Sequence, residues 1–162
     1  MKHFALPLLL LTILLNACSS NDDDVQDESD ILGTYRLTGF NLDTDETTPE
    51  LQLITVVYES LLANDCDFLN WRFEADGTFV ALTTLVAIEG VFTDNGTVQC
   101  PEGLTQEVQG SWSFIDGNLL VSNADMPSDV MIEVSGKKLI VKGEDLDPES
   151  LSGIILEFTK QN

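Results

Sequence analysis

Apolar and polar residues alternate along most of the chain from Leu32 onward, and turn-forming residues interrupt the alternation at short intervals. A period of two places one face of each segment in a core and the other in solvent, as in antiparallel β-strands. The pattern predicts an all-β domain, a sheet, sandwich or barrel, that spans residues 31–162. It contains eight predicted strands, at residues 33–42, 68–74, 78–87, 107–114, 118–123, 130–135, 138–142 and 154–160.

Three short turn sequences predict tight hairpins between neighbouring strands. Asp116-Gly117 suits a two-residue type I′ turn, and Gly136-Lys137 suits a type II′ turn. Ala75-Asp76-Gly77 suits a three-residue loop that pairs Phe73 with Phe79, although a two-residue loop is also compatible with this sequence. If the strands alternate in direction, the three hairpins lie at one end of the fold and the long connections lie at the other.

One segment between the first two strands has helical periodicity. Thr48 suits the N-cap, Pro49 suits the first helical position, and Asn64 suits the end. We therefore expect a helix over residues 49–63. Its apolar residues recur at helical spacing: Leu51, Ile54, Tyr58, Leu61 and Leu62.

The first seventeen residues have the features of an export signal. Lys2 and His3 provide a positive start, and the apolar stretch that follows is shorter than the roughly 20 residues that span a bilayer. The next residues, Leu15-Asn16-Ala17-Cys18, resemble the bacterial lipobox. The resemblance implies that residues 1–17 are removed and that Cys18 carries the lipid that attaches the protein to the membrane. An ordinary signal peptide with a chance cysteine is the alternative.

Residues 18–30 are predicted to form the lipidated cysteine and a flexible tether. The stretch 19–30 carries six acidic residues and almost no apolar ones, so it has too little apolar surface to fold. Its start, Ser20-Asn21-Asp22-Asp23-Asp24, resembles the acidic surface-export signal of Bacteroidota lipoproteins, and a plain acidic spacer is an equal alternative. We expect a lipid-anchored outer-membrane protein, exposed to the periplasm or at the cell surface.

The charge of the mature chain excludes several classes of function. Beyond residue 17 the chain has 28 acidic residues, six basic ones (seven less Lys2) and no histidine, since the single His3 lies in the signal. Such a charge repels nucleic acid, which is therefore not an expected partner. Without histidine the chain lacks the usual general base and zinc ligand, so we expect no enzyme activity, no cofactor and no metal site.

Cys66 and Cys100 remain once Cys18 is assigned to lipid, and they form an even pair in an oxidising compartment. A disulfide between them is the expected state, and a free reactive thiol or a metal-binding pair is the alternative. Both cysteines belong to the long connections at the same predicted end of the fold, as a disulfide requires.

Several motifs together resemble one known family. Leu32-Gly33-Thr34-Tyr35-Arg36-Leu37 is similar to the Gly-x-Trp motif that opens lipocalin-type barrels, with Tyr35 in the place of Trp. Phe73-Glu74-Ala75-Asp76-Gly77-Thr78-Phe79, the two cysteines and Gly110-Ser111-Trp112-Ser113-Phe114 complete the pattern. Over essentially the whole mature domain, the chain resembles the lipocalin-like domain lipoproteins of the Bacteroidota type. The resemblance implies an eight-stranded antiparallel up-and-down barrel with one short helix between strands 1 and 2.

An eight-stranded barrel either is filled by side chains or holds one small ligand. We weigh two functions on this basis. One is non-catalytic binding of a small apolar or amphipathic ligand inside the barrel, and the other is an accessory subunit that binds an envelope protein partner, with a packed barrel and an exposed apolar patch. The candidate pocket residues are aromatic side chains at inward positions: Tyr35, Trp71, Phe73, Phe79, Trp112 and Phe114.

Carboxylates also gather in the long connections. Oxygen-rich loops can hold calcium, but none of these clusters fits the twelve-residue calcium loop. Solvated acidic surface is the simpler interpretation, and a weak cation site is the alternative. The clusters are Asp43-x-Asp45-Glu46, Asp65-x-Asp67 and Glu144-Asp145-x-Asp147-x-Glu149.

Overall fold

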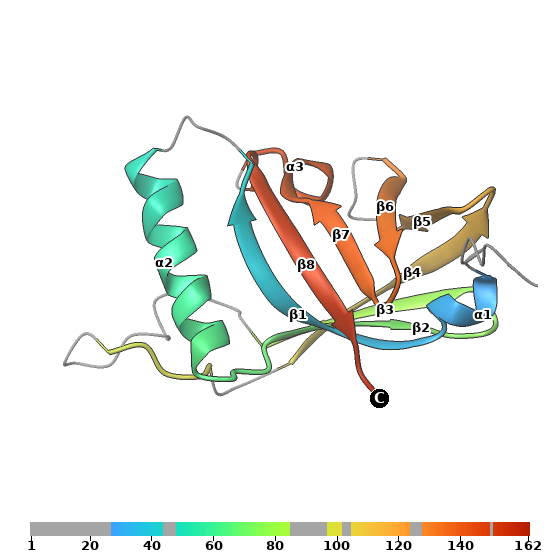
Figure 1. Ribbon diagram of the computed structural model, residues 1–162, viewed down its shortest axis with the longest axis horizontal. Helices are drawn as coiled ribbons and strands as arrows, with labels where there is room; N and C mark the ends of the chain where they lie inside the picture. Colours follow the sequence, from blue (N-terminus) through green and yellow to red (C-terminus); the bar gives the residue numbers. More distant parts are fainter. Residues whose placement is uncertain (1–26, 44–47, 85–96, 102–104, 124–127, 150) are drawn as a thin grey trace, which may run out of the picture.

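The computed structural model describes residues 27–43, 48–84, 97–101, 105–123, 128–149 and 151–162. Eight antiparallel strands pair in chain order, and β8 pairs with β1 to close a barrel (Figure 1). The predicted up-and-down barrel is therefore confirmed. The strands are β1 (Gly33–Leu42), β2 (Leu69–Phe73), β3 (Thr78–Thr83), β4 (Gln106–Ile115), β5 (Asn118–Ser122), β6 (Val130–Ser135), β7 (Lys138–Lys142) and β8 (Ile154–Lys160).

All three tight hairpins form as the turn sequences predict. Asp116-Gly117 takes positive φ angles of 53° and 80°, as the two central residues of a type I′ turn require. Gly136 takes a φ of 59° in the turn between β6 and β7. Phe73 pairs with Phe79, so the open question of that register is settled in favour of the three-residue loop, with Gly77 at a φ of 83°.

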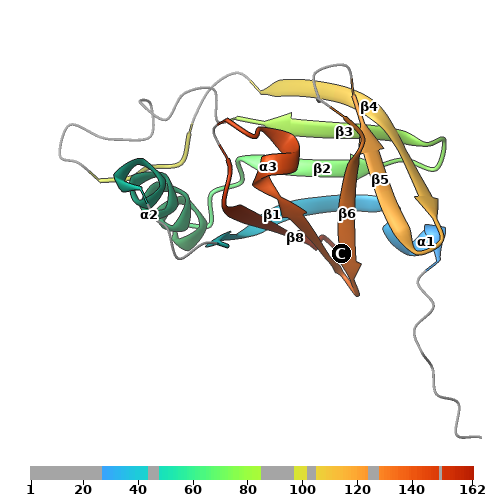
Figure 2. The same ribbon diagram turned by 90° about the horizontal axis from the view of Figure 1, so that it is seen from above.

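The predicted helix is α2 (Pro49–Ala63). It starts where the sequence indicates, because the Thr48 side chain accepts a hydrogen bond from the Leu51 N–H at 3.2 Å. Val57 and Leu61 are buried, and the helix packs mainly against β1. Figure 2 shows α2 beside one end of the barrel, far from the tight hairpins that β2 and β3, and β4 and β5, form.

A short helix, α1 (Glu28–Ile31), forms where the sequence predicts only flexible tether. Ile31 is fully buried, and the Asp30 carbonyl oxygen accepts hydrogen bonds from the Tyr35 hydroxyl at 3.2 Å and from Lys160 Nζ at 2.6 Å. Residues 28–30, which the sequence predicts as the end of a flexible tether, are therefore helical and joined to the barrel. The acidic composition of residues 27–30 gave no sign that they continue the ordered domain that begins at Ile31.

A second unpredicted helix, α3 (Gly143–Leu146), lies in the connection from β7 to β8. Gly143 is buried, and a Cβ at this position would clash with the Leu151 carbonyl oxygen. Glycine thus permits the close approach of α3 to the start of β8.

Several predicted features lie outside the described residues, namely the signal 1–17, Cys18, the tether up to residue 26, Asp45-Glu46 and residues 85–87 of the third strand. Strand β3 ends at Thr83, and the other strands end within one residue of their predicted limits. Among the helices of the described ranges, none combines the length and apolar composition that a membrane span needs.

Candidate functional site

The barrel interior brings the predicted pocket residues together at the end where the tight hairpins lie. Phe73 lies at the centre of the group, with ring centroids 5.6 Å from Tyr35, 5.4 Å from Phe79 and 5.7 Å from Trp112. These distances are those of contacting aromatic rings. Within the group of six, Tyr35, Trp71, Phe73, Phe79 and Trp112 are buried, and Phe114 is half-buried.

The two indole rings extend the same cluster across the barrel. Trp71 packs edge-on against Phe79 at 5.2 Å and stacks on Phe158 of β8 at 4.3 Å. Trp112 Nε1 donates a hydrogen bond to the Glu74 carbonyl oxygen at 2.9 Å, which satisfies its polar atom. The side chains predicted as walls of a ligand pocket therefore fill this half of the barrel with their own contacts.

The opposite half of the barrel is less closed. Ala81 and Val108 face each other across β3 and β4, on the inward side that also carries Phe79 and Trp112, and both are part-exposed. Both side chains are small beside the rings of the other half. Solvent therefore reaches inward positions of β3 and β4 at the long-connection end.

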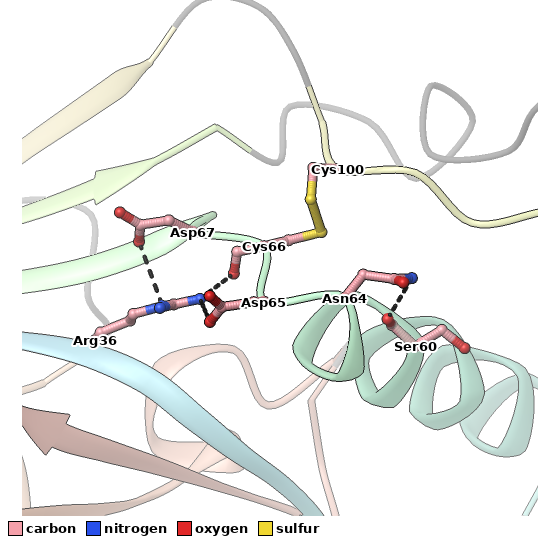
Figure 3. The surroundings of a disulfide bond; sticks show 7 residues. All are labelled: Arg36, Ser60, Asn64, Asp65, Cys66, Asp67 and Cys100. Atoms are coloured by element: carbon pink, nitrogen blue, oxygen red, sulfur yellow. Dashed lines mark hydrogen bonds and ion pairs between the residues drawn. A yellow bond between two sulfur atoms is a disulfide. The ribbon is translucent and has the colours of Figure 1, made fainter.

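A disulfide and an arginine fix the corner between α2 and β2 (Figure 3). Cys66 and Cys100 are bonded, with a Cα–Cα distance of 5.2 Å, as the sequence predicts. Arg36 Nη2 donates to the Cys66 carbonyl oxygen at 3.0 Å and pairs with the Asp65 carboxylate at 2.9 Å. Asp67 lies 3.8 Å from Arg36 Nε. The acidic pair considered as a cation site is thus oriented toward a guanidinium of the protein itself.

The other described carboxylates give no support to a metal site. The Asp147 side chain accepts a hydrogen bond from the Glu149 N–H at 3.0 Å, which is a local turn contact. Across the described ranges, no three side chains of His, Cys, Asp or Glu lie close enough together to hold one ion.

A groove lies on the outer wall of the barrel, where β6 changes its strand partner. Registered pairs join β5 to β6 only from Val130 to Ile132, and β7 to β6 only from Glu133 to Ser135. In Figure 1, β6 and β7 converge at their shared turn and diverge toward α3. The resulting groove has a volume of about 590 Å³ and runs from the turn between β4 and β5 to Asp145 of α3.

The floor of this groove, which we call the β6 groove, is apolar, and its rim is mainly acidic. Met131, Ile140 and Ile155 lie between buried neighbours on β6, β7 and β8, so their side chains point outward. The charged residues that line it are Asp43, Glu133, Asp145 and Lys142. The groove is not among the features predicted from the sequence, although apolar residues at solvent-facing positions of three consecutive strands indicate an exposed apolar surface.

Burial of Tyr35 makes the stability of the fold sensitive to alkaline pH. Desolvation raises the pKa of Tyr35 to about 12, and the nearby negative charge of Asp30 adds to this effect. Desolvation also raises the pKa of Tyr58, which stacks on Phe40 between α2 and β1. Because the folded state favours the neutral phenol, both side chains stabilise the fold below their unfolded pKa.

We expect the free energy of unfolding to fall as pH rises from about 10 to about 12, because the unfolded chain releases the Tyr35 proton first. Tyr35→Phe should show a smaller fall over this range, with Tyr58 responsible for part of the remainder. Urea titrations at several pH values measure both profiles. Identical pH profiles for the two proteins would contradict the assignment to Tyr35.

Comparison with known proteins gives matches at the level of solved structures. No family model matches the chain, and no curated protein matches its sequence. A lipocalin-like protein from Bacteroides uniformis is similar, with 14% identity, coverage of 82% of this chain and 99% of that chain, and a TM-score of 0.41. An uncharacterised protein from Bacteroides eggerthii matches with 11% identity, 81% and 99% coverage and a TM-score of 0.42.

A third similar structure is a DUF4847 family protein from Bacteroides vulgatus, with 14% identity, coverage of 82% of this chain and 96% of that chain, and a TM-score of 0.39. The fold itself is established by the strand order, since eight antiparallel strands closed in chain order form the barrel architecture of lipocalins. The chain has a lipocalin-like barrel fold.

Proposed function

We propose that this protein is a lipid-anchored, non-catalytic lipoprotein of the bacterial outer membrane whose barrel binds an envelope protein partner through its outer surface. The observation that carries this proposal is the contrast between the two sides of the barrel wall. Phe73, Phe79 and Trp71 fill the hairpin half of the interior with ring contacts, whereas Met131 on the outer wall is 61% exposed. Exposed apolar side chains that line a groove are typical of interaction surfaces.

Further exposed apolar side chains support an interaction role. Leu53 and Val56 lie three residues apart on α2, and their side chains are 60% and 57% exposed. The absence of histidine beyond residue 17 supports a non-catalytic role, because a general base would have to come from a carboxylate, tyrosine or lysine.

A small apolar ligand at the long-connection end of the barrel is the second candidate function. The part-exposed inward side chains Ala81 and Val108 favour it, since a ligand there would contact the inner faces of β3 and β4. The aromatic side chains of the opposite half would then form the base of the site.

The position of α1 supports an orientation for the anchored protein. The chain enters the barrel through α1, at the end where the tight hairpins lie, and Cys18 precedes Asp27 by nine residues. Lipid on Cys18 would hold this end toward the membrane. The end that carries α2 and the disulfide would then face away from the bilayer.

Native and denaturing mass spectrometry of the protein, extracted gently from its own host's envelope, tests these proposals together. We expect an intact mass that begins at lipidated Cys18 and a polypeptide partner that co-purifies. A reproducible adduct of a few hundred daltons that denaturation removes, without a polypeptide partner, would favour the small-ligand function. An unlipidated N-terminus at another residue would contradict the membrane anchor.

A further inference from the structure

We propose that the β6 groove binds an extended, basic and amphipathic segment of the partner polypeptide. This inference rests on the proposed protein-binding function and assigns a site and a partner chemistry to it. The argument depends on the shape, the floor and the charge of the groove.

The shape follows from the way that β6 is paired. The first half of β6 pairs with β5, and its second half pairs with β7. Each half of β6 therefore lacks registered backbone pairs on one of its two sides. Ile132 and Val134 belong to the inward face of β6, yet they also line the groove. A groove that follows one strand accommodates an extended chain, whose side chains alternate between floor and rim.

The floor supplies an apolar surface that is exposed at Met131 and part-exposed at Ile140 and Ile155. Ile155 of β8 pairs with Lys142 of β7, Ile140 lies two residues before Lys142 on the same strand, and Met131 lies on the neighbouring β6. Methionine side chains adapt to different apolar partners, because they are unbranched and flexible. Two or three aliphatic side chains of a partner segment would bury this floor.

The acidic side chains at the rim determine the sign of the charge that a bound segment should carry. Asp43, Glu133 and Asp145 line the groove, and within the described residues none of the three forms an ion pair. Among the described residues that line the groove, Lys142 is the single basic one. The whole chain carries a formal net charge of −21, which adds a long-range attraction for cationic segments.

The same charges disfavour a second copy of this chain as the occupant. Two copies would bring two strongly negative molecules together and would place one acidic rim beside another. A partner segment with alternating basic and aliphatic residues would place its aliphatic side chains on the floor and its lysine or arginine side chains against the acidic rim.

The test uses the chain from Ser19 to Asn162, exported so that the disulfide forms; it contains every strand that closes the barrel. The probe is a fluorescent eight-residue peptide of alternating Lys and Leu, and its control has Glu in place of Lys. We expect binding of the Lys–Leu peptide only, weakened by added salt. Amide chemical-shift changes should centre on Met131, Ile140 and Ile155.

Two groove variants and two matched controls separate this site from general attraction to an acidic protein. Met131→Ser and Glu133→Lys should each weaken peptide binding about fivefold, or roughly 1 kcal/mol. The controls are Ile115→Ser, at an exposed isoleucine outside the groove, and Glu107→Lys, at an exposed carboxylate of β4. They should change the affinity by less than about twofold. Equal losses in the groove variants and the controls would overturn the proposal.

Two further outcomes distinguish a wrong binding site from a wrong class of ligand. If the envelope partner still co-purifies with the full-length Met131→Ser variant, the protein-binding function stands and the β6 groove is not its site. If octylammonium binds the groove as tightly as the peptide does, the occupant is a small cationic amphiphile and the proposal of a polypeptide segment is overturned. Loss of the partner in Met131→Ser, with retention in Ile115→Ser, supports both proposals.

Discussion

Replacement of Phe79 by alanine is expected to lower the free energy of unfolding by about 3–5 kcal/mol. Phe79 is fully buried, and its ring contacts Trp71 and Phe73 on the adjacent strand. The substitution removes these contacts and leaves a cavity that the surrounding rings fill only partially. Urea denaturation, followed through tryptophan fluorescence, measures the difference, because both Trp71 and Trp112 lie in the same cluster.

Phe79→Leu provides the control, since it keeps most of the volume and should cost less than about 1.5 kcal/mol. Ile115→Ala provides a second control, because that side chain is 56% exposed and its loss should change stability by less than about 0.5 kcal/mol. If Phe79→Ala lost no more than the surface variant, the interior would be a preformed pocket, and the small-ligand function would become the better proposal.

Removal of the disulfide is expected to have an effect of similar size. The double variant Cys66→Ser/Cys100→Ser frees a loop with a sequence separation of 34 residues. In the chain-entropy model this loop closure stabilises the fold by about 4 kcal/mol. Comparison of the chemical denaturation midpoints of the oxidised wild type and the double variant measures the loss.

The wild-type protein with its disulfide reduced should unfold at nearly the same denaturant concentration as the double variant. A variant that matched the oxidised wild type would show that the Arg36 contacts to Cys66, Asp65 and Asp67 hold this corner without the covalent bond. Arg36→Gln in the double variant would then identify their contribution.

Much of the barrel could be predicted because its strands and turns are determined by residues that are close together in the sequence. The strand alternation and the turns at Asp116-Gly117 and Gly136-Lys137 each depend on a few neighbouring residues, and the structure has the strands and turns that they predict. The disulfide was predicted by counting the cysteines of a chain that we expect to be exported, and Cys66–Cys100 is bonded. Thr48 and Pro49 likewise predicted the start of α2 correctly.

The candidate site was less predictable, because its features depend on contacts between residues distant in sequence. Arg36 and Asp65 are 29 positions apart, and neither residue alone predicts that they pair. The β6 groove depends on where β6 leaves β5, which the alternation of its side chains does not encode. The inward direction of Phe73 and Phe79 was correctly predicted, but whether their rings line a pocket or fill it depends on packing.

The docking of α1 has a consequence for where this protein can act. With Ile31 buried in α1 at the barrel end, only residues 19–26 would separate the proposed lipid on Cys18 from the described domain. Eight residues reach at most about 28 Å when fully extended. The anchored barrel would sample a thin layer next to the bilayer, in which two proteins on one membrane meet at a high effective concentration. A segment that binds the β6 groove weakly in solution can therefore occupy it when its own protein is attached to the same membrane.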